Sequence, residues 1–442
     1  MDSAVFYRSA HAQYPLAVAA AGAVVTDANG NDYLDMSGGA AVSCLGHGHP
    51  DVIGATCRQL EALAFAHTAF FTNGPQEALA KRLAERFLEA GARVYFVSGG
   101  SEATETALKL AWQYHAARGQ PERKVIISRE HSYHGNTLGA LSVSGNNARR
   151  RASAAPLIDW PRIPPCYAYR EQLPDETIAA YGERAAKTLD RAIAACGADK
   201  VAAFIAEPVV GSSLGVVPAT PGYFRLVRDI CDRHGILLIA DEIMCGSGRT
   251  GRYFAHEHEG IVPDLVTLAK GIGGGVQPLG AVVLREKVVS TLEESGFIHG
   301  HTYVGHAAAC AAGLAVQTVI DRDNLLTRTQ LLGEELLNLL DDAFREHPHV
   351  GNIRTRGLFA GIELVSDRVS RAGFDNGAGL DTALRLAALE RGLICYPGGI
   401  SVDGRFVPHV MLAPPMIVSR EQMREGVRRL ARAVDTVLAQ RR

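Results

Sequence analysis

The feature that most constrains the fold is an alternation, between residues 90 and 285, of short apolar runs with helix-like segments. The runs are rich in β-branched residues and apolar on both faces, which is typical of strands covered by helices on both sides. Strands separated by helices usually lie parallel in one sheet. The clearest runs are RVYFVS (93–98), VAAFIAE (201–207), ILLIADE (236–242) and LVTLAK (265–270). We therefore expect an α/β fold with a mainly parallel sheet.

The two ends of the chain predict a second, smaller domain. After residue 305 helices dominate, and the last 90 residues mix short strands with helices before a final amphipathic helix. Near the start, VVTDANGNDYLDM contains Asn-Gly, a strong hairpin signal. A chain of 442 residues suits more than one domain. We expect residues 1–58 and 326–442 to form a small α+β domain beside a large α/β domain over 59–325.

Composition narrows the classes of partner. The formal net charge of −2 gives no overall attraction for nucleic acid or an anionic membrane, and we expect neither. The N-terminal residues lack a basic start and polar residues interrupt their apolar patch, so we expect no signal peptide or membrane span. Eight cysteines occur singly without a CxxC pair, which predicts reduced thiols in the cytoplasm. We expect no metal site, because the HxH at 299–301 lacks further ligands at suitable spacing.

Polar residues end four of the predicted strands: Ser98, Glu207, Asp241 and Lys270. In an open parallel sheet, ligands bind at the edge formed by the carboxyl ends of the strands. Each of these residues alone could be a helix cap or a loop residue. Four at the same edge predict a ligand site.

Lys270 and Asp241 indicate the chemistry of that site. A partly desolvated lysine is a good amine nucleophile toward aldehydes, and the glycines that follow Lys270 leave room for a flat cofactor. Asp241 follows an apolar run, so its carboxylate should be buried and needs a cation or several donors. A protonated pyridine ring nitrogen is one such partner. A salt bridge to Arg249 or Arg252 is the alternative.

Two further motifs fit the same site. SGGSEATETALKL combines a strand end, a turn of small residues and a helix starting at Ser101, which favours anion binding. It matches neither GxGxxG nor GxxxxGK[ST], which disfavours dinucleotide and Walker-type sites. Serine capping of a tight turn is the alternative. Tyr133 in HSYHGNT offers an aromatic face for a ring, although a packing role also fits.

Taken together, these residues resemble the class III (ω-type) aminotransferases of the fold-type I pyridoxal 5′-phosphate (PLP) superfamily, over nearly the whole chain. The fold implied is a large domain with a seven-stranded, mainly parallel sheet covered by helices, plus a smaller α+β domain. The matching motifs are DYLDMSGGAAVSCLGHGHP, SGGSEATETALKLA, SYHG, AEPV, IADEIMCGSGRTG, LAKGIGGGVQPLGA and GHTYVGHAAACAA.

The resemblance implies a role for each matching residue. Lys270 would bond to the aldehyde of the cofactor and carry the substrate's proton, Asp241 would pair with the pyridine nitrogen, and Glu207 would lie near the ring hydroxyl. Thr302 would reach the phosphate in a neighbouring subunit, because the family's site is shared across a homodimer. A tetramer is a further possibility. The other implied cofactor contacts are Gly99, Gly100, Ser101, Tyr133, His134 and Ile243.

The activity implied is ping-pong transfer of an amino group from an ω-amino acid or primary amine to a keto acid such as pyruvate. Relatives on the same fold aminate the biotin precursor 7-keto-8-aminopelargonate with adenosylmethionine as donor, or act as decarboxylases or aminomutases. Outside the family, a nicotinamide-dependent dehydrogenase would need a GxGxxG, which is absent. A non-catalytic binding protein would not need Lys270.

The sequence differs from the family pattern at residues expected to contact the substrate. Where many members carry a carboxylate-binding arginine, this chain has Tyr396, followed by an extended loop over 397–414. Arg405 in that loop is a stand-in for the missing arginine, or an exposed loop residue. Ala41 replaces a bulky aromatic, which predicts a roomier pocket. Phe70 lines the entrance or packs in the core.

Overall fold

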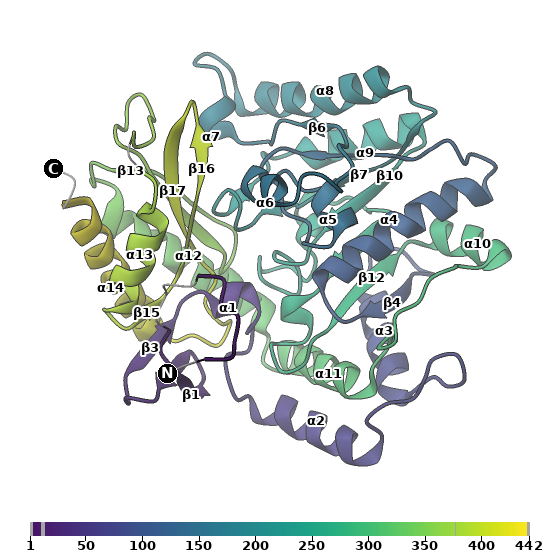
Figure 1. Ribbon diagram of the computed structural model, residues 1–442, viewed down its shortest axis with the longest axis horizontal. Coiled ribbons are helices and arrows are strands. Elements are labelled where there is room, and N and C mark those ends of the chain that lie inside the picture. The colour runs from purple at the N-terminus through teal and green to yellow at the C-terminus, as the bar shows by residue number, and fades with distance from the viewer. Residues whose placement is uncertain (1–2, 10–13, 376, 440–442) are drawn as a thin grey trace.

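The computed structural model describes residues 3–9, 14–375 and 377–439. A larger α/β part lies beside a smaller part that is built from both ends of the chain (Figure 1). Within the described residues, no helix is long and apolar enough to cross a membrane.

A seven-stranded sheet forms the centre of the large part, in the order β4-β12-β11-β10-β7-β5-β6. Only β12 runs antiparallel to its neighbours, so the predicted α/β fold with a mainly parallel sheet is confirmed. The strands are β4 (Arg93–Val97), β5 (Val125–Arg129), β6 (Arg162–Ile163), β7 (Val201–Ala206), β10 (Leu237–Asp241), β11 (Leu265–Leu268) and β12 (Gly280–Leu284).

Helices cover both faces of this sheet. On β7, Ala203 and Ile205 pack on one face against α4 and α10, while Phe204 and Ala206 pack on the other against α8 and α9. This alternation explains why the strands read as apolar throughout. The helices around the sheet are α2 (Pro50–Ala62), α3 (Gly74–Arg86), α4 (Gly100–Ala117), α8 (Ile178–Cys196), α9 (Tyr223–His234), α10 (Glu286–Ser295) and α11 (Ala307–Arg322).

The smaller part contains an antiparallel sheet, β13-β14-β17-β16, which is packed against three helices. The strands are β13 (Val350–Thr355), β14 (Ala360–Leu364), β16 (Tyr396–Val402) and β17 (Arg405–Leu412). The helices are α12 (Leu325–Phe344), α13 (Leu380–Leu389) and α14 (Arg420–Ala439).

The N-terminal strands share a second small sheet with the C-terminal part of the chain. The Asn-Gly turn joins an antiparallel hairpin, and Leu34 on its second strand pairs with Leu393. The strands are β1 (Ala17–Ala21), β2 (Val24–Asp27), β3 (Asp32–Asp35) and β15 (Leu393–Ile394). The domain boundaries at 58 and 325 stay predictions.

The expectation of an extended loop over 397–414 is wrong. β16 and β17 form a hairpin in which Tyr396 pairs with Met411 and Val402 pairs with Arg405. Asp403 and Gly404 form its turn with φ of 50° and 79°, which fits the twisted two-residue turn that Asp-Gly favours. The dipeptide within an apolar run was the overlooked signal.

Short elements complete the large part and help to frame the site. They are α1 (Gly38–Ala41), α5 (Leu138–Ser142), α6 (Asn147–Ala152), α7 (Ala168–Glu171), β8 (Val209–Val210) and β9 (Val217–Pro218), with 3-10 turns η1 (Ala255–Glu259) and η2 (Lys270–Ile272).

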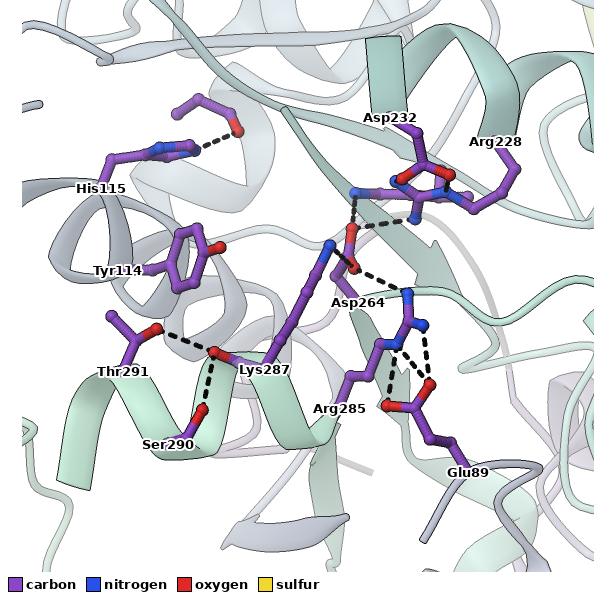
Figure 2. Close-up of polar contacts among 12 residues, drawn as sticks. Glu89, Tyr114, His115, Arg228, Asp232, Asp264, Arg285, Lys287, Ser290 and Thr291 are labelled. Carbon is purple, nitrogen blue, oxygen red and sulfur yellow. Dashed lines mark hydrogen bonds and ion pairs between the residues drawn. The ribbon is translucent and has the colours of Figure 1, made fainter. Parts of the chain in front are cut away.

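A buried charge cluster fixes the start of β11, the strand whose other end leads to Lys270 (Figure 2). Asp264 is fully buried, with Oδ2 2.8 Å from Nη1 of Arg228 and Oδ1 2.5 Å from Nζ of Lys287. Although burial opposes ionisation, Arg228 and Lys287 hold the pKa of this carboxyl below its ordinary value. The cluster therefore ties α9 and α10 to β11.

Candidate active site

Three of the four polar strand-end residues line one cavity of about 430 Å³: Glu207, Asp241 and Lys270. They meet because β7, β10 and β11 are parallel, so their carboxyl ends share one edge. β4 points the same way, since β12 is antiparallel both to it and to β11. Ser98 itself does not line the cavity, but Gly100 and Ser101 just beyond it do.

Lys270 has an unusual backbone and a perturbed amine. It lies just beyond β11 with φ of 51°, in the left-handed region that residues other than glycine rarely adopt and that is often found at functional sites. Burial lowers the pKa of its ammonium group, although Asp241 and Glu207 oppose the shift. The amine is therefore neutral at a lower pH than in an ordinary lysine.

Asp241 is held by donors on both oxygens. It is 3% exposed, and its Oδ2 lies 2.6 Å from Nδ1 of His134, while its Oδ1 accepts a hydrogen bond from the backbone N–H of Ile243 at 3.1 Å. His134 also lines the cavity. The alternative partner, Arg249, instead donates to the carbonyls of Leu358 and Pro414.

Glu207 is a buried carboxyl at the cavity wall. Burial raises its pKa, against the opposing effects of His134 and Arg129. Nη2 of Arg129 lies 3.8 Å from Oε2, and the backbone N–H of Tyr133 reaches Oε1 at 3.5 Å. Within the described part of the chain, Oε2 has no hydrogen-bond partner. This atom is available to a bound molecule.

The start of α4 forms an anion-binding wall. This 18-residue helix begins at Gly100 without a side-chain cap, so its first N–H groups are free for a ligand. A Cβ on Gly100 would lie 3.0 Å from the side chain of Ile243, so a larger residue there would have to displace Ile243. Tyr133 and Ile243 also line the cavity, whereas Gly99 precedes the helix outside the lining. Oγ of Ser101 accepts a hydrogen bond from the N–H of Asn136 at 3.0 Å, which ties this wall to the Tyr133 segment.

Arg405 lies apart from the cavity, whereas Tyr396 lines it. Nε of Arg405 donates to Oδ1 of Asp375 at 2.6 Å. It starts β17 six residues before Met411, the partner of Tyr396, and this corresponds to roughly 20 Å along the strand. The hairpin thus keeps Arg405 away from the position predicted for it.

The remaining predicted residues do not line the cavity of this chain. Phe70 is 79% exposed and Thr302 is also exposed. Ala41 is buried directly behind Gly39 and Ala40, which do line it.

Sequence reasoning missed several cavity residues, above all two arginines, Arg8 and Arg149. Arg149 begins a run of three arginines, which is the only signal that marked the segment, and nothing in the sequence marks Arg8. The other missed residues are Gly39, Ala40, Gly135, Val209, Gly211, Ser212, Met244 and Cys245.

The donor set fits PLP. An uncapped helix start suits a phosphate, a buried aspartate suits a pyridinium, and an amine of lowered pKa suits an aldehyde. His134 Nε2 and Glu207 Oε2 are buried without partners among the described residues, so polar atoms remain for the ligand. No group of three or more His, Cys, Asp or Glu in these residues could hold a metal ion.

Comparison with known families decides the class. The family model "Aminotransferase class-III" matches residues 6–434. The chain belongs to this family. An uncharacterized aminotransferase of Schizosaccharomyces pombe is 40% identical, over 98% of this chain and 95% of its own. A putrescine–pyruvate aminotransferase of Pseudomonas aeruginosa is 33% identical, over 95% of this chain and 90% of its own.

A solved structure agrees with the fold of this aminotransferase. The ω-transaminase of Pseudomonas jessenii, in complex with PMP, superposes with a TM-score of 0.90 at 32% identity, covering 97% of this chain and 93% of the other. The fold-type I assignment is therefore confirmed, and the protein is a PLP-dependent transaminase.

Proposed function

We propose that this aminotransferase moves an amino group from an ω-amino acid or primary amine to a keto acid such as pyruvate. The observation that carries the proposal is that Lys270, Asp241 and Glu207 share one cavity with the open start of α4. The similarity to a putrescine–pyruvate aminotransferase supports an amine donor and a keto acid acceptor.

When bound, PLP supplies an aldehyde that captures amines and a ring that accepts the electrons released when a C–H bond breaks. The neutral amine of Lys270 would hold that aldehyde, and the same amine would carry the substrate's proton as a base and then as an acid. Asp241 would stabilise a positive charge on the ring nitrogen, and His134 fixes the aspartate in place. Lys270 and Asp241 thus divide proton transfer and charge stabilisation between them.

The other walls orient the cofactor. The N–H groups at Gly100 and Ser101 would hold its phosphate, and Tyr133 and Ile243 would contact its ring. Glu207, whose pKa is raised, would hold a proton close to the ring hydroxyl and the substrate. A Cβ on Gly99 would enter open space, because it meets no atom within 4 Å, and the glycine would leave that space free beside the helix start.

The test is a panel of ω-amino acids and primary amines supplied with pyruvate. We expect alanine to form together with a carbonyl product from the amine. Release of carbon dioxide, or turnover of a single substrate without an acceptor, would assign the protein to the decarboxylases or aminomutases of this fold. Activity confined to 7-keto-8-aminopelargonate would favour the other aminotransferase class.

We also infer a homodimer with shared sites. Phe65 and Tyr303 pack 5.8 Å apart on segments that expose Phe70 and Ile298, at 79% and 85%. Such an exposed apolar surface indicates an interface, and Thr302 lies on it. Light scattering should give a mass of twice 47.2 kDa or, for a tetramer, four times that value. A monomer would contradict the inference.

Finally, we infer a cytoplasmic location. All eight cysteines are free thiols, and burial raises the pKa of most of them, as in Cys44, where it reaches about 11. Free thiols persist in reducing compartments. Cell fractionation that recovers the activity from an oxidising compartment would contradict this location.

A further inference from the structure

The cavity contains two arginines that pair with no carboxylate among the described residues. Arg8 and Arg149 both line it, and in the described part of the chain neither forms an ion pair with Asp or Glu. By contrast, Arg150, the neighbour of Arg149, pairs with Asp159 at 3.0 Å. A guanidinium in a ligand cavity without a counter-ion is a binding site for an anion.

The position of Arg149 is built by its neighbours. Asn146 caps α6, because its side chain accepts the backbone N–H of Arg149 at 3.2 Å. Arg150 anchors the same helix by donating to the carbonyls of Leu141 and Ser142 at 3.0 and 2.7 Å. The helix is therefore fixed by one arginine, which leaves the preceding one for the cavity.

Arg149 lies against the ring of Tyr133. Its Cζ is 4.6 Å from the ring centroid, and its Nη1 donates to the hydroxyl of Tyr133 at 3.2 Å. This contact holds the guanidinium over the residue that is proposed to contact the cofactor, and it uses few of the five N–H donors. The remaining donors are free for a substrate.

The charges in the cavity favour a carboxylate as that substrate group. The lining carboxylates are Asp241, which is held by His134, and Glu207, which lies near Arg129. Neither is within ion-pair distance of Arg149 in the described structure. No described carboxylate therefore competes with an incoming anion for Arg149, which is exposed.

We propose that Arg149, together with Arg8, binds the carboxylate of the keto acid acceptor, an inference that rests on the transaminase function proposed above. Arg149 takes the task for which Arg405 was considered, because Arg405 is paired with Asp375 at the end of the hairpin. Tyr396, which occupies the other candidate position, lines the cavity but carries no positive charge.

The test compares two acceptors with one amine donor: pyruvate, and propanal, which lacks the carboxylate. Arg149→Ala should lower kcat/KM for pyruvate by about 10- to 100-fold, mainly through KM, because a hydrogen bond to a charged group is lost. The kcat/KM for propanal should not change in Arg149→Ala. In Arg149→Lys, part of the lost kcat/KM for pyruvate should be recovered. Arg151→Ala is the matched control, because Arg151 lies on the same helix, donates to the carbonyl of Asn147 and is outside the lining.

A second readout does not need turnover. Propionate binding to the PLP-loaded enzyme, measured by calorimetry, should weaken by about 10-fold in Arg149→Ala and stay unchanged in Arg151→Ala. If the wild type transaminates nothing yet shows this pattern, the proposed function fails and the carboxylate site stands. The role of Arg149 would be overturned if Arg149→Ala lowered kcat/KM equally for pyruvate and propanal, or lowered it for neither. A matching loss of PLP affinity in this variant would also overturn it.

Discussion

Asp241 and Glu242 form a natural pair for separating catalysis from folding. They are adjacent, both are buried, and each contacts a histidine: Asp241 meets His134 at 2.6 Å, and Glu242 meets His256 at 2.7 Å. Only Asp241 lines the cavity. The same change, from carboxylate to amide, should therefore have opposite consequences at the two positions.

In Asp241→Asn, the carboxamide keeps the size of the side chain but loses the charge opposite the ring nitrogen. A hydrogen bond to a charged group contributes about 1.5–3 kcal/mol, and two unit charges 4 Å apart interact by about 4 kcal/mol in a partly polar environment. If the transition state loses about 2–4 kcal/mol of stabilisation, kcat should fall by roughly 30- to 1000-fold.

In Glu242→Gln, the loss should appear in stability. The carboxylate of Glu242 accepts backbone N–H groups of Ala255 and His256 at 2.5 and 2.8 Å as well as the histidine ring. Weakening this buried network should cost about 1–3 kcal/mol in the free energy of unfolding. The kcat of the folded enzyme should change little, because Glu242 does not face the cofactor cavity.

The assay measures kcat with a saturating amine and pyruvate, and urea unfolding in parallel, on both variants and the wild type. The expected result is a large loss of kcat for Asp241→Asn and a near-normal kcat for Glu242→Gln. The larger loss of stability should occur in Glu242→Gln, because Glu242 accepts three hydrogen bonds and Asp241 two. A kcat within about three-fold of the wild type would mean that Asp241 contributes less than about 1 kcal/mol of stabilisation. That result for Asp241→Asn would refute the pairing with the ring nitrogen.

Three further predictions concern pH, specificity and stability. Burial lowers the pKa of Lys270, so the rate at which the apoenzyme captures PLP should fall only below a pH inflection that lies under 10.5, the pKa of an ordinary lysine. Absorbance stopped flow measures this rate, and an inflection at a higher pH would contradict the prediction. Arg405→Ala should leave KM for pyruvate within about two-fold, because its partner is a surface carboxylate, and steady-state kinetics that show a tenfold rise would return Arg405 to the site. Asp264→Ala should lower the free energy of unfolding by about 3 kcal/mol, since it removes the buried carboxylate that pairs with Arg228 and Lys287 (Figure 2). In the same urea titration the surface change Asp159→Ala should cost under about 1 kcal/mol, and equal losses would contradict the buried role.

Residue pattern alone predicted the parts of this fold that follow from burial and strand direction. Strands that are apolar on both faces can be stable only beneath helices on both sides, which predicted the sheet. Parallel strands place their carboxyl ends together, which predicted that Glu207, Asp241 and Lys270 would meet. The structure brings these three residues to one cavity.

The substrate side could not be predicted in the same way. Arg149 reaches the cavity because Arg150 anchors a short helix through backbone carbonyls, a contact that no periodicity reveals. Arg405 was considered for the site because the Asp-Gly turn was not weighed against a loop, and the hairpin places this arginine outside the cavity lining. The roles of Thr302 and Phe70 depend on a second chain, so they stay predictions.

The central claim is that Lys270 is the residue that bonds to the cofactor aldehyde. Its most direct test is borohydride reduction of the PLP-loaded protein, followed by proteolysis and mass spectrometry of the labelled peptide. The account predicts a single pyridoxyl group on the peptide that contains Lys270, and a Lys270→Ala variant that takes up no label and shows no turnover. A label on another lysine, or near-normal turnover by the variant, would contradict it.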